Sequence, residues 1–293
     1  MKGIVLAGGS GTRLHPITIP VSKQLLPVGD KPMIYYPLSV LLLAGIRDIL
    51  LIGKSIDLPH FRRLLGDGSH LGVEITYAAQ DVPRGVAEAL VIGADHIGAE
   101  PCALILGDNI FHGSVFSKLL RDEVAAVDGC TLFGYPVSDP ERYGVGVLDE
   151  QGRLVSLEEK PLRPHSNRAV TGLYFYDADV VARAAALRPS ARGELEITDL
   201  NQQYLADGRA KLIDLGRGYA WLDAGTPEAL MQASQYVRTI EERQGVRIAC
   251  LEETALRMGF IGADDCYRLG VEQSGSAYGR YVMEIARELG ADS

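Results

Sequence analysis

Short apolar runs alternate with amphipathic stretches through the first third of this chain of 293 residues. The apolar runs predict buried β-strands, at residues 3–7, 48–52, 73–78 and 102–106. The stretches between them predict helices, at residues 33–44, 58–65 and 86–97. Continuous apolar strands separated by helices favour a mostly parallel sheet that is covered by helices on both faces.

The pattern changes in the middle of the chain, where the connections become shorter. Strands are predicted there, at residues 131–137, 145–148, 154–158 and 171–176, and they favour a mixed or antiparallel extension of the sheet. A helix at residues 199–205 and strands at residues 211–215 and 219–222 follow. From Pro227 onward only helices are predicted, one over residues 227–244 with Thr226 as its N-cap and then two or three shorter ones.

These elements predict an α/β fold with a Rossmann-like, mostly parallel central sheet flanked by helices, a mixed-strand region and a small helical C-terminal cap. The main domain is expected over residues 1–226. The helical segment over residues 227–293 is expected to pack on it and to make subunit contacts. The sequence has no hexapeptide repeat, which argues against a β-helical second domain.

Composition narrows the classes of function. The net charge of −9 argues against a nucleic-acid partner but allows a small phosphorylated ligand. No apolar run approaches the ~20 residues of a membrane helix, and Met1 stands directly before the first predicted strand, so neither a membrane partner nor a signal peptide is expected. The four cysteines lie far apart without metal-ligand spacing, which is typical of reduced thiols in a cytoplasmic protein.

A glycine-rich loop, GGSGTR at residues 8–13, follows the first predicted strand. Small side chains allow several backbone N–H groups to point at one anion, and Arg13 and Lys23 add two cations. The loop is not a P-loop, because no Lys follows Gly11, and Leu14 stands where a Rossmann fingerprint has its third glycine. We interpret it as a nucleoside triphosphate site, although a simple strand-to-helix turn is the alternative.

Polar residues follow other predicted strands at the edge where ligands bind in α/β sheets. Gln80 offers a donor and an acceptor to the edge of a pyrimidine base, unless it is only a polar loop residue. Asp108 and Asp223 could share one Mg²⁺, although Asp108 could instead cap a following helix. Residues 141–144 and 158–161 combine carboxylates with cations, which suits a sugar phosphate but is also common on solvated surfaces.

Together with the glycine loop, the segment SKQLLP at residues 22–27 resembles the sugar nucleotidyltransferases, in particular the bacterial glucose-1-phosphate thymidylyltransferases. Further matching segments extend over nearly the whole chain, at residues 30–37, 107–109, 141–145, 158–161, 170–177, 192–199 and 221–223. The resemblance implies Mg²⁺-dependent conversion of dTTP and glucose 1-phosphate to dTDP-glucose and pyrophosphate, the first step of dTDP-deoxysugar biosynthesis. It also implies a homotetramer, a dimer of dimers, that a dTDP-sugar could inhibit at a second site.

The resemblance assigns roles to individual residues. The expected catalytic residues are Arg13, Lys23, Asp108 and Asp223, of which Asp108 and Asp223 are the expected metal ligands. The nucleotide is expected to contact Leu6, Gly8, Gly9, Gly11, Thr12, Arg13, Gln80, Gly85 and Asp108, with Gln80 on the thymine edge. The sugar phosphate is expected to contact Lys23, Tyr143, Gly144, Glu159, Lys160 and Val170. The sequence shows no convincing Ser-His-Asp or Cys-His set, in agreement with direct attack by an ionised sugar phosphate.

Some positions depart from the family pattern. Arg84 and Glu88 stand where an acidic residue and a Gln are more common, and Ala224 stands where Thr is usual. Residues 144–147, GVGV, replace a stretch that often carries a Glu. The sequence therefore leaves open which base and which sugar phosphates the protein accepts. The first alternative to a thymidylyltransferase is a uridylyltransferase for a hexose 1-phosphate. A non-catalytic sugar-nucleotide sensor is the alternative from another class.

Overall fold

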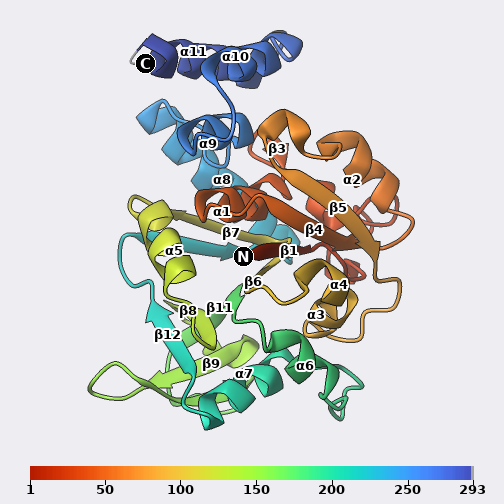
Figure 1. The fold of residues 1–293 in the computed structure, drawn as a ribbon, viewed down its shortest axis with the longest axis vertical. Helices are drawn as coiled ribbons and strands as arrows, with labels where there is room; N and C mark the ends of the chain where they lie inside the picture. The colour runs from red at the N-terminus through yellow and green to blue at the C-terminus, as the bar shows by residue number, and fades with distance from the viewer. Residues whose placement is uncertain (292–293) are drawn as a thin grey trace.

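A nine-stranded sheet runs through the molecule (Figure 1), of which the computed structural model describes residues 1–291. Four neighbouring strands are parallel, in the order β6 (Cys102–Leu106), β1 (Lys2–Leu6), β4 (Asp48–Gly53) and β5 (Glu74–Ala79). The side chains of β1, β4 and β6 are buried on both faces of the sheet, which explains why each of these strands is a continuous apolar run, whereas the edge strand β5 has exposed residues such as Glu74 and Thr76. The predicted α/β fold is confirmed.

The other half of the sheet is mixed, as the short connections predicted. Strand β11 (Arg168–Tyr176) lies antiparallel to β6 and continues onto β8 (Cys130–Pro136) and β9 (Gly144–Leu148). The remaining two strands are β10 (Leu154–Glu159), antiparallel to β9, and β12 (Ala210–Asp214), parallel to β8. This half extends the parallel strands beyond β6 and forms one wall of the site described below.

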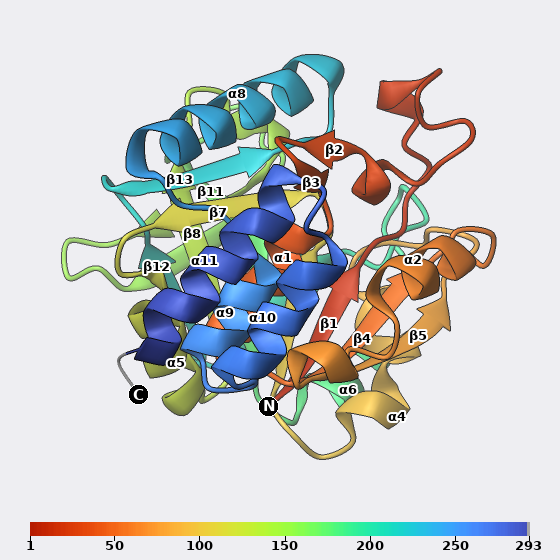
Figure 2. The ribbon, with the colours of Figure 1, turned by 90° about the horizontal axis from the view of Figure 1, so that it is seen from above.

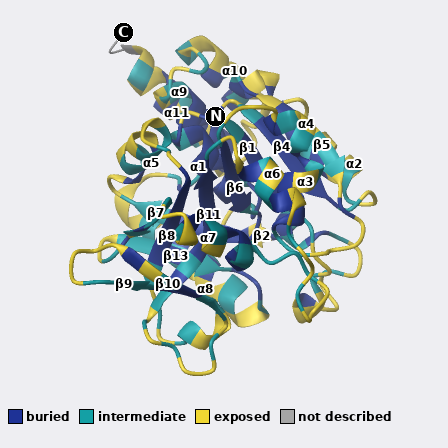
Figure 3. Cartoon of the chain, turned by 60° about the horizontal axis from the view of Figure 1, so that its bottom comes forward, coloured by how far each residue is buried: buried dark blue, intermediate teal, exposed yellow. Residues whose placement is uncertain are grey.

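Successive residues of the buried strands point into two separate cores, one on each face of the sheet. Val5 belongs to the core that includes residues of α1 (Tyr35–Leu43), α2 (Leu58–Leu65) and α5 (Phe116–Ala125). Ile4 packs on the opposite face, against a second set of helices. These are α3 (Glu88–Ile92), α4 (Ala94–Ile97), α6 (Val180–Ala185) and α7 (Ile197–Ala206). Figure 3 shows the strands as the buried interior between exposed helix surfaces.

Two predicted helices need correction. The helix expected over residues 86–97 is two helices, α3 and α4, divided at Gly93. Gly93 packs tightly, since a Cβ there would lie 2.6 Å from Ile4 Cδ1. The helix expected over residues 33–44 begins only at Tyr35, because the preceding residues form a ribbon of β2 (Pro27–Val28) and β3 (Lys31–Pro32).

Other elements were not predicted at all. Helices α5 and α6 are two of them, and strand β7 (Asn109–Gly113) is a third. Strand β7 pairs in antiparallel register with β13 (Tyr219–Asp223) and so brings Asp223 opposite Asn109. Among residues 1–291 no helix is both long enough and apolar enough to cross a membrane.

The C-terminal part is helical, as predicted. It contains α8 (Pro227–Gln244), α9 (Leu251–Arg257), α10 (Ala263–Glu272) and α11 (Ala277–Ala291). Thr226 is confirmed as the N-cap of α8, since its Oγ1 accepts a hydrogen bond from Ala229 N at 3.2 Å. Figure 2 shows α10 and α11 side by side, and α9 packs against α1.

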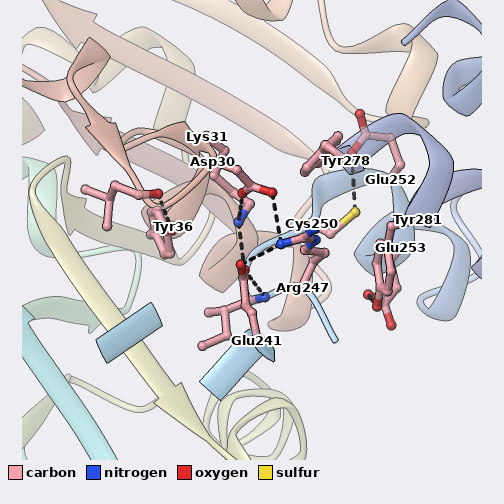
Figure 4. A network of polar contacts seen from close by, with 12 residues as sticks. Asp30, Lys31, Tyr36, Glu241, Arg247, Cys250, Glu252, Glu253, Tyr278 and Tyr281 are labelled. Atoms are coloured by element: carbon pink, nitrogen blue, oxygen red, sulfur yellow. Dashed lines mark hydrogen bonds and ion pairs between the residues drawn. The ribbon is translucent and has the colours of Figure 1, made fainter. Parts of the chain in front are cut away.

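A cluster of charged residues joins α8 to the β2–β3 ribbon (Figure 4), and we call Asp30, Lys31, Glu241 and Arg247 the ion cluster; of these, Lys31 and Glu241 are buried. Lys31 Nζ lies 2.9 Å from Glu241 Oε1 and 2.7 Å from Asp30 Oδ1. Arg247 Nη1 lies 3.0 Å from Glu241 Oε2 and 3.2 Å from Asp30 Oδ2. These contacts cross the boundary at residue 226, and the division of the chain at that point stays a prediction.

Candidate active site

Strands β1, β5 and β6 end at the same edge of the parallel sheet, and a polar loop follows each. The loops enclose a pocket of about 270 Å³, the loop pocket, between the glycine loop and α7. A second pocket of about 330 Å³, the sheet pocket, lies over β9, β11 and β13. Both pockets are lined by Leu106, Asp108, Glu159 and Lys160. Two ligands held in these pockets would therefore lie next to each other.

Most of the residues predicted from sequence meet in these pockets. The loop pocket is lined by Leu6, Gly8, Gly9, Lys23, Gln80, Gly85, Asp108, Glu159 and Lys160. The sheet pocket is lined by Arg13, Asp108, Tyr143, Gly144, Glu159, Lys160, Val170 and Asp223. Gly11 instead lines a neighbouring hollow of about 200 Å³, and Thr12 lines neither of the two pockets.

Asp108 lies at the centre of the site and is 8% exposed. Its carboxylate forms an ion pair with the Lys23 ammonium and accepts a hydrogen bond from Asn109 Nδ2 at 3.1 Å. Burial alone would raise the pKa of Asp108, but Lys23 and these hydrogen bonds outweigh burial and hold the pKa below its ordinary value. The residue that follows begins β7, so the helix-capping alternative for Asp108 is wrong.

Asp223 reaches the same place from the far end of the sequence. Its strand pairs with β7, and Ala224 N donates a hydrogen bond to the Asp108 backbone oxygen at 3.2 Å. Burial, and then the charge of the Asp108 carboxylate, raise the pKa of Asp223, while Lys23 and Arg13 oppose that rise. The carboxylates of the two predicted metal ligands are therefore close enough to repel each other. A divalent cation bound between them would reduce that repulsion.

The donor set fits magnesium in chemistry and in number. Among residues 1–291 no group of three or more His, Cys, Asp or Glu side chains could hold a metal ion by itself. Mg²⁺ is commonly held by one or two carboxylates together with water and substrate phosphates. Asp108 and Asp223 supply such a pair beside the pockets.

Arg13 lies beside Asp223, and both side chains approach the backbone at Gly225. A Cβ on Gly225 would lie 2.8 Å from Arg13 Nη2 and 3.0 Å from Asp223 Oδ1. A side chain at position 225 would therefore push the ends of the Arg13 and Asp223 side chains away from the backbone. Together, Arg13 and Lys23 bring two positive charges to the two carboxylates.

Glu159 and Lys160 form the opposite wall. Glu159 Oε2 accepts a hydrogen bond from Thr198 Oγ1 at 2.6 Å, and Arg192 Nη2 lies 3.4 Å from Glu159 Oε1. Lys160 adopts φ 44°, a left-handed conformation that is uncommon without glycine, while its N–H bonds to the Tyr143 carbonyl at 3.0 Å. Such backbone conformations are often found at functional sites.

Comparisons with known proteins agree with this geometry. The family model described as "Nucleotidyl transferase" matches residues 2–240. The chain belongs to the nucleotidyl transferase family. The resemblance drawn from the motifs is confirmed, and this nucleotidyltransferase is an enzyme of the predicted class.

Several relatives of this nucleotidyltransferase carry the name glucose-1-phosphate thymidylyltransferase. The protein of Xanthomonas campestris pv. campestris is 55% identical over 286 residues, which cover 98% of this chain and 97% of that protein. The protein of Neisseria meningitidis is 54% identical over 98% of this chain and 100% of its own length. The protein of Mycobacterium tuberculosis is 54% identical over 97% of this chain and 99% of its own length.

Two solved structures share the fold. A putative glucose-1-phosphate thymidylyltransferase from Bacillus anthracis, in complex with a sucrose, superposes with a TM-score of 0.76 at 41% identity. That match covers 81% of this chain and 95% of the other. A UDP-glucose pyrophosphorylase complexed with UDP-glucose superposes with a TM-score of 0.68 at 25% identity, covering 81% of this chain and 98% of the other.

The nucleotidyltransferase site also contains residues that sequence reasoning missed. Gln24 is 1% exposed, and its Nε2 donates a hydrogen bond to the Gly8 carbonyl at 3.3 Å. Asn109 Oδ1 accepts hydrogen bonds from Trp221 Nε1 at 2.6 Å and from Gly172 N at 3.1 Å. Gln24 and Asn109 both belong to segments that match the family, and this match was the one signal in the sequence that could have identified them. Their hydrogen-bond partners become known only from the folded structure.

The two charged departures from the family pattern lie together. Arg84 Nη2 is 2.7 Å from Glu88 Oε1, and Glu88 is 5% exposed. Gln80 Nε2 donates a hydrogen bond to Glu88 Oε2 at 2.8 Å. Glu88 thus contacts the residue that is predicted to face the base, and Arg84, whose side chain is exposed, contacts Glu88.

Proposed function

We propose that this enzyme is a glucose-1-phosphate thymidylyltransferase, which converts dTTP and α-D-glucose 1-phosphate to dTDP-glucose and pyrophosphate. The observation that carries the proposal is the pair of adjoining pockets that share Asp108, Glu159 and Lys160, with Lys23 lining one and Arg13 the other. The relatives of that name, 54–55% identical over nearly the whole chain, support the choice of substrates.

The loop pocket takes the nucleotide in this proposal, and the sheet pocket takes the sugar phosphate. Gln80 faces the base, while Glu159 and Lys160 contact the sugar phosphate where the pockets meet. A phosphate monoester has a second pKa of about 6, so the attacking oxygen is already ionised at neutral pH and needs no general base. Within the part of the chain that the structure describes, the two linings contain no Ser, Cys or His.

Catalysis then consists of alignment and charge neutralisation. The pockets hold the attacking oxygen and the α-phosphate next to each other, which removes most of the entropic barrier to their meeting. Lys23 and Arg13 stabilise the negative charge that develops on the α-phosphate and on the departing pyrophosphate. We propose Mg²⁺ as the cofactor, held by Asp108 and Asp223; when bound, it neutralises and orients the triphosphate.

The test is release of pyrophosphate from dTTP and glucose 1-phosphate in the presence of Mg²⁺, with product identified as dTDP-glucose. No release from any combination of nucleoside triphosphate and hexose 1-phosphate would contradict the proposal. A sensor without catalysis would give that result, but the chain retains Arg13, Lys23, Asp108 and Asp223 together at the pockets.

A uridylyltransferase is the second candidate, and the structural likeness to a UDP-glucose pyrophosphorylase favours keeping it. Thymine and uracil differ by one methyl group, and an apolar contact to a methyl group is worth only about 1–3 kcal/mol. Comparison of kcat/KM for dTTP and UTP distinguishes the two candidates, since the proposal expects dTTP to be the better substrate.

We also propose the wider context that the sequence suggested. The enzyme acts in the cytoplasm as a homotetramer, and residues 227–293 contribute to its subunit contacts. A dTDP-sugar can inhibit it at a second site, and its product supplies dTDP-deoxysugar biosynthesis. Sedimentation analysis tests the tetramer. Non-competitive inhibition by a dTDP-sugar, with two molecules bound per chain, tests the second site.

A further inference from the structure

Glu88 is a buried acid behind the loop pocket, and its carboxylate holds two neighbouring side chains. Gln80 Nε2 donates a hydrogen bond to Oε2 at 2.8 Å, and Arg84 Nε donates one to Oε1 at 2.7 Å. The Arg84 backbone N–H points at Oε2 as well, at 3.3 Å. Glu88 is 5% exposed, so water does not compete freely for these bonds.

An ionised carboxylate only accepts hydrogen bonds, which fixes the orientation of the Gln80 amide. The NH₂ end must face Glu88. The carbonyl end, Oε1, therefore faces Gly8, where a built Cβ would lie 2.8 Å from it. Across residues 1–291, no N–H or O–H group donates a hydrogen bond to Gln80 Oε1. Gln80 thus presents a free acceptor and a second N–H donor in a fixed order.

That order matches one kind of pyrimidine. Thymine and uracil carry an N3–H donor beside the C4 carbonyl acceptor, so they complement Oε1 and the second N–H of Gln80. Cytosine carries an N3 acceptor beside an exocyclic amino donor, which is the reverse order. Cytosine could pair with Gln80 only if the amide rotated by half a turn, and rotation would place Oε1 against the Glu88 carboxylate.

We propose that Glu88 is a positioning residue that locks the Gln80 amide, and that this lock selects keto pyrimidines over cytosine. The inference rests on the proposed function, because it assumes that the base lies against Gln80. It gives the unusual acid at position 88 a role in choosing the nucleotide, and it assigns Arg84 the lesser role of a counter-ion to Glu88.

The experiment compares dTTP and dCTP as substrates of the wild type, Glu88→Gln and Arg84→Ala, each with glucose 1-phosphate. A Gln at position 88 can accept or donate, so it permits either orientation of Gln80. We expect Glu88→Gln to lower the dTTP/dCTP ratio of kcat/KM about tenfold, the equivalent of one net hydrogen bond, mainly through KM. Arg84→Ala keeps the Glu88–Gln80 bond and is expected to keep the wild-type ratio.

The outcomes separate the inference from the function on which it rests. If the wild type transfers no thymidylyl group, the proposed function fails. If the wild type is active and Glu88→Gln leaves the ratio unchanged, or changes kcat alone for both nucleotides, the inference fails. If Glu88→Gln does not fold, the affinities of the wild type for dTDP and dCDP, measured by calorimetry, test the inference instead. Equal affinity for the two would overturn the lock, and tighter binding of dTDP by about tenfold or more would support it.

Discussion

The ion cluster allows a quantitative test of how the C-terminal helices are joined to the sheet. Glu241 is its centre, because its carboxylate binds Lys31 at 2.9 Å, Arg247 at 3.0 Å and the Ile248 N–H at 2.9 Å. The side chains of Lys31 and Glu241 are only 2% and 3% exposed. Glu241→Ala would leave Lys31 buried with Asp30 as its remaining carboxylate partner.

Removal of one partner from a buried ion pair typically costs about 3–5 kcal/mol, because the other charge stays desolvated. Folded proteins are stable by only about 5–15 kcal/mol, so Glu241→Ala removes a large part of the free energy of unfolding. For a chain of this length each kcal/mol corresponds to about 2 °C, so we expect Tm to fall by about 6–10 °C. Urea unfolding followed by circular dichroism gives the free energy, and a thermal scan gives Tm.

The adjacent residue provides a matched control on the same helix. Glu242 forms an ion pair with Arg238 at 2.7 Å, but its side chain is 62% exposed. Glu242→Ala should therefore cost less than about 1 kcal/mol. The double variant Lys31→Met, Glu241→Leu removes both buried charges and should recover most of the loss. The reasoning is refuted if Glu241→Ala is as mild as Glu242→Ala, or if the double variant is less stable than Glu241→Ala.

Three further predictions concern the site and its surroundings. Lys23→Met should lower kcat about 10²–10³-fold, as loss of a preorganised charge commonly does, while far-ultraviolet circular dichroism stays unchanged. Asp223→Asn should weaken binding of Mg²⁺ and thus raise the Mg²⁺ concentration needed for half-maximal activity; an unchanged requirement would remove Asp223 from the metal site. Burial lowers the pKa of His112, whose ring bonds to Tyr236, below its ordinary value. The pKa of His112 is thus lower in the folded protein than in the unfolded chain, so the free energy of unfolding is at its full value above about pH 6.5 and falls as the pH falls through the folded pKa. Urea unfolding at pH 7 and pH 5 should therefore show a smaller decrease of this free energy in His112→Gln than in the wild type.

The sequence predicts β1, β4 and β6 well because these strands are buried on both faces and form continuous apolar runs. The prediction of one helix over residues 86–97 is wrong because the backbone leaves the helical conformation at Gly93, with φ −82° and ψ 7°, which the pattern of apolar residues does not show. Strand β7 mixes polar and apolar residues, and its partner β13 lies about a hundred residues later, so no local signal indicates it.

The same limit applies to the site. The glycine loop, Gln80 and Asp108 follow predicted strands, so the rule that ligands bind at strand ends is enough to find them. The meeting of Asp108 with Asp223 depends on the β7–β13 pairing, and the Glu88 contact with Gln80 depends on the turn between them. Contacts of this kind arise from tertiary structure, which no local pattern of residues contains.

In the proposed reaction the sugar phosphate displaces pyrophosphate directly, without a nucleotidyl-enzyme intermediate. Incubation of the enzyme with dTTP, Mg²⁺ and ³²P-labelled pyrophosphate, with and without glucose 1-phosphate, tests it. We expect label to enter dTTP only when glucose 1-phosphate is present. Label entering dTTP without any sugar phosphate would show a covalent intermediate and would rule out direct displacement.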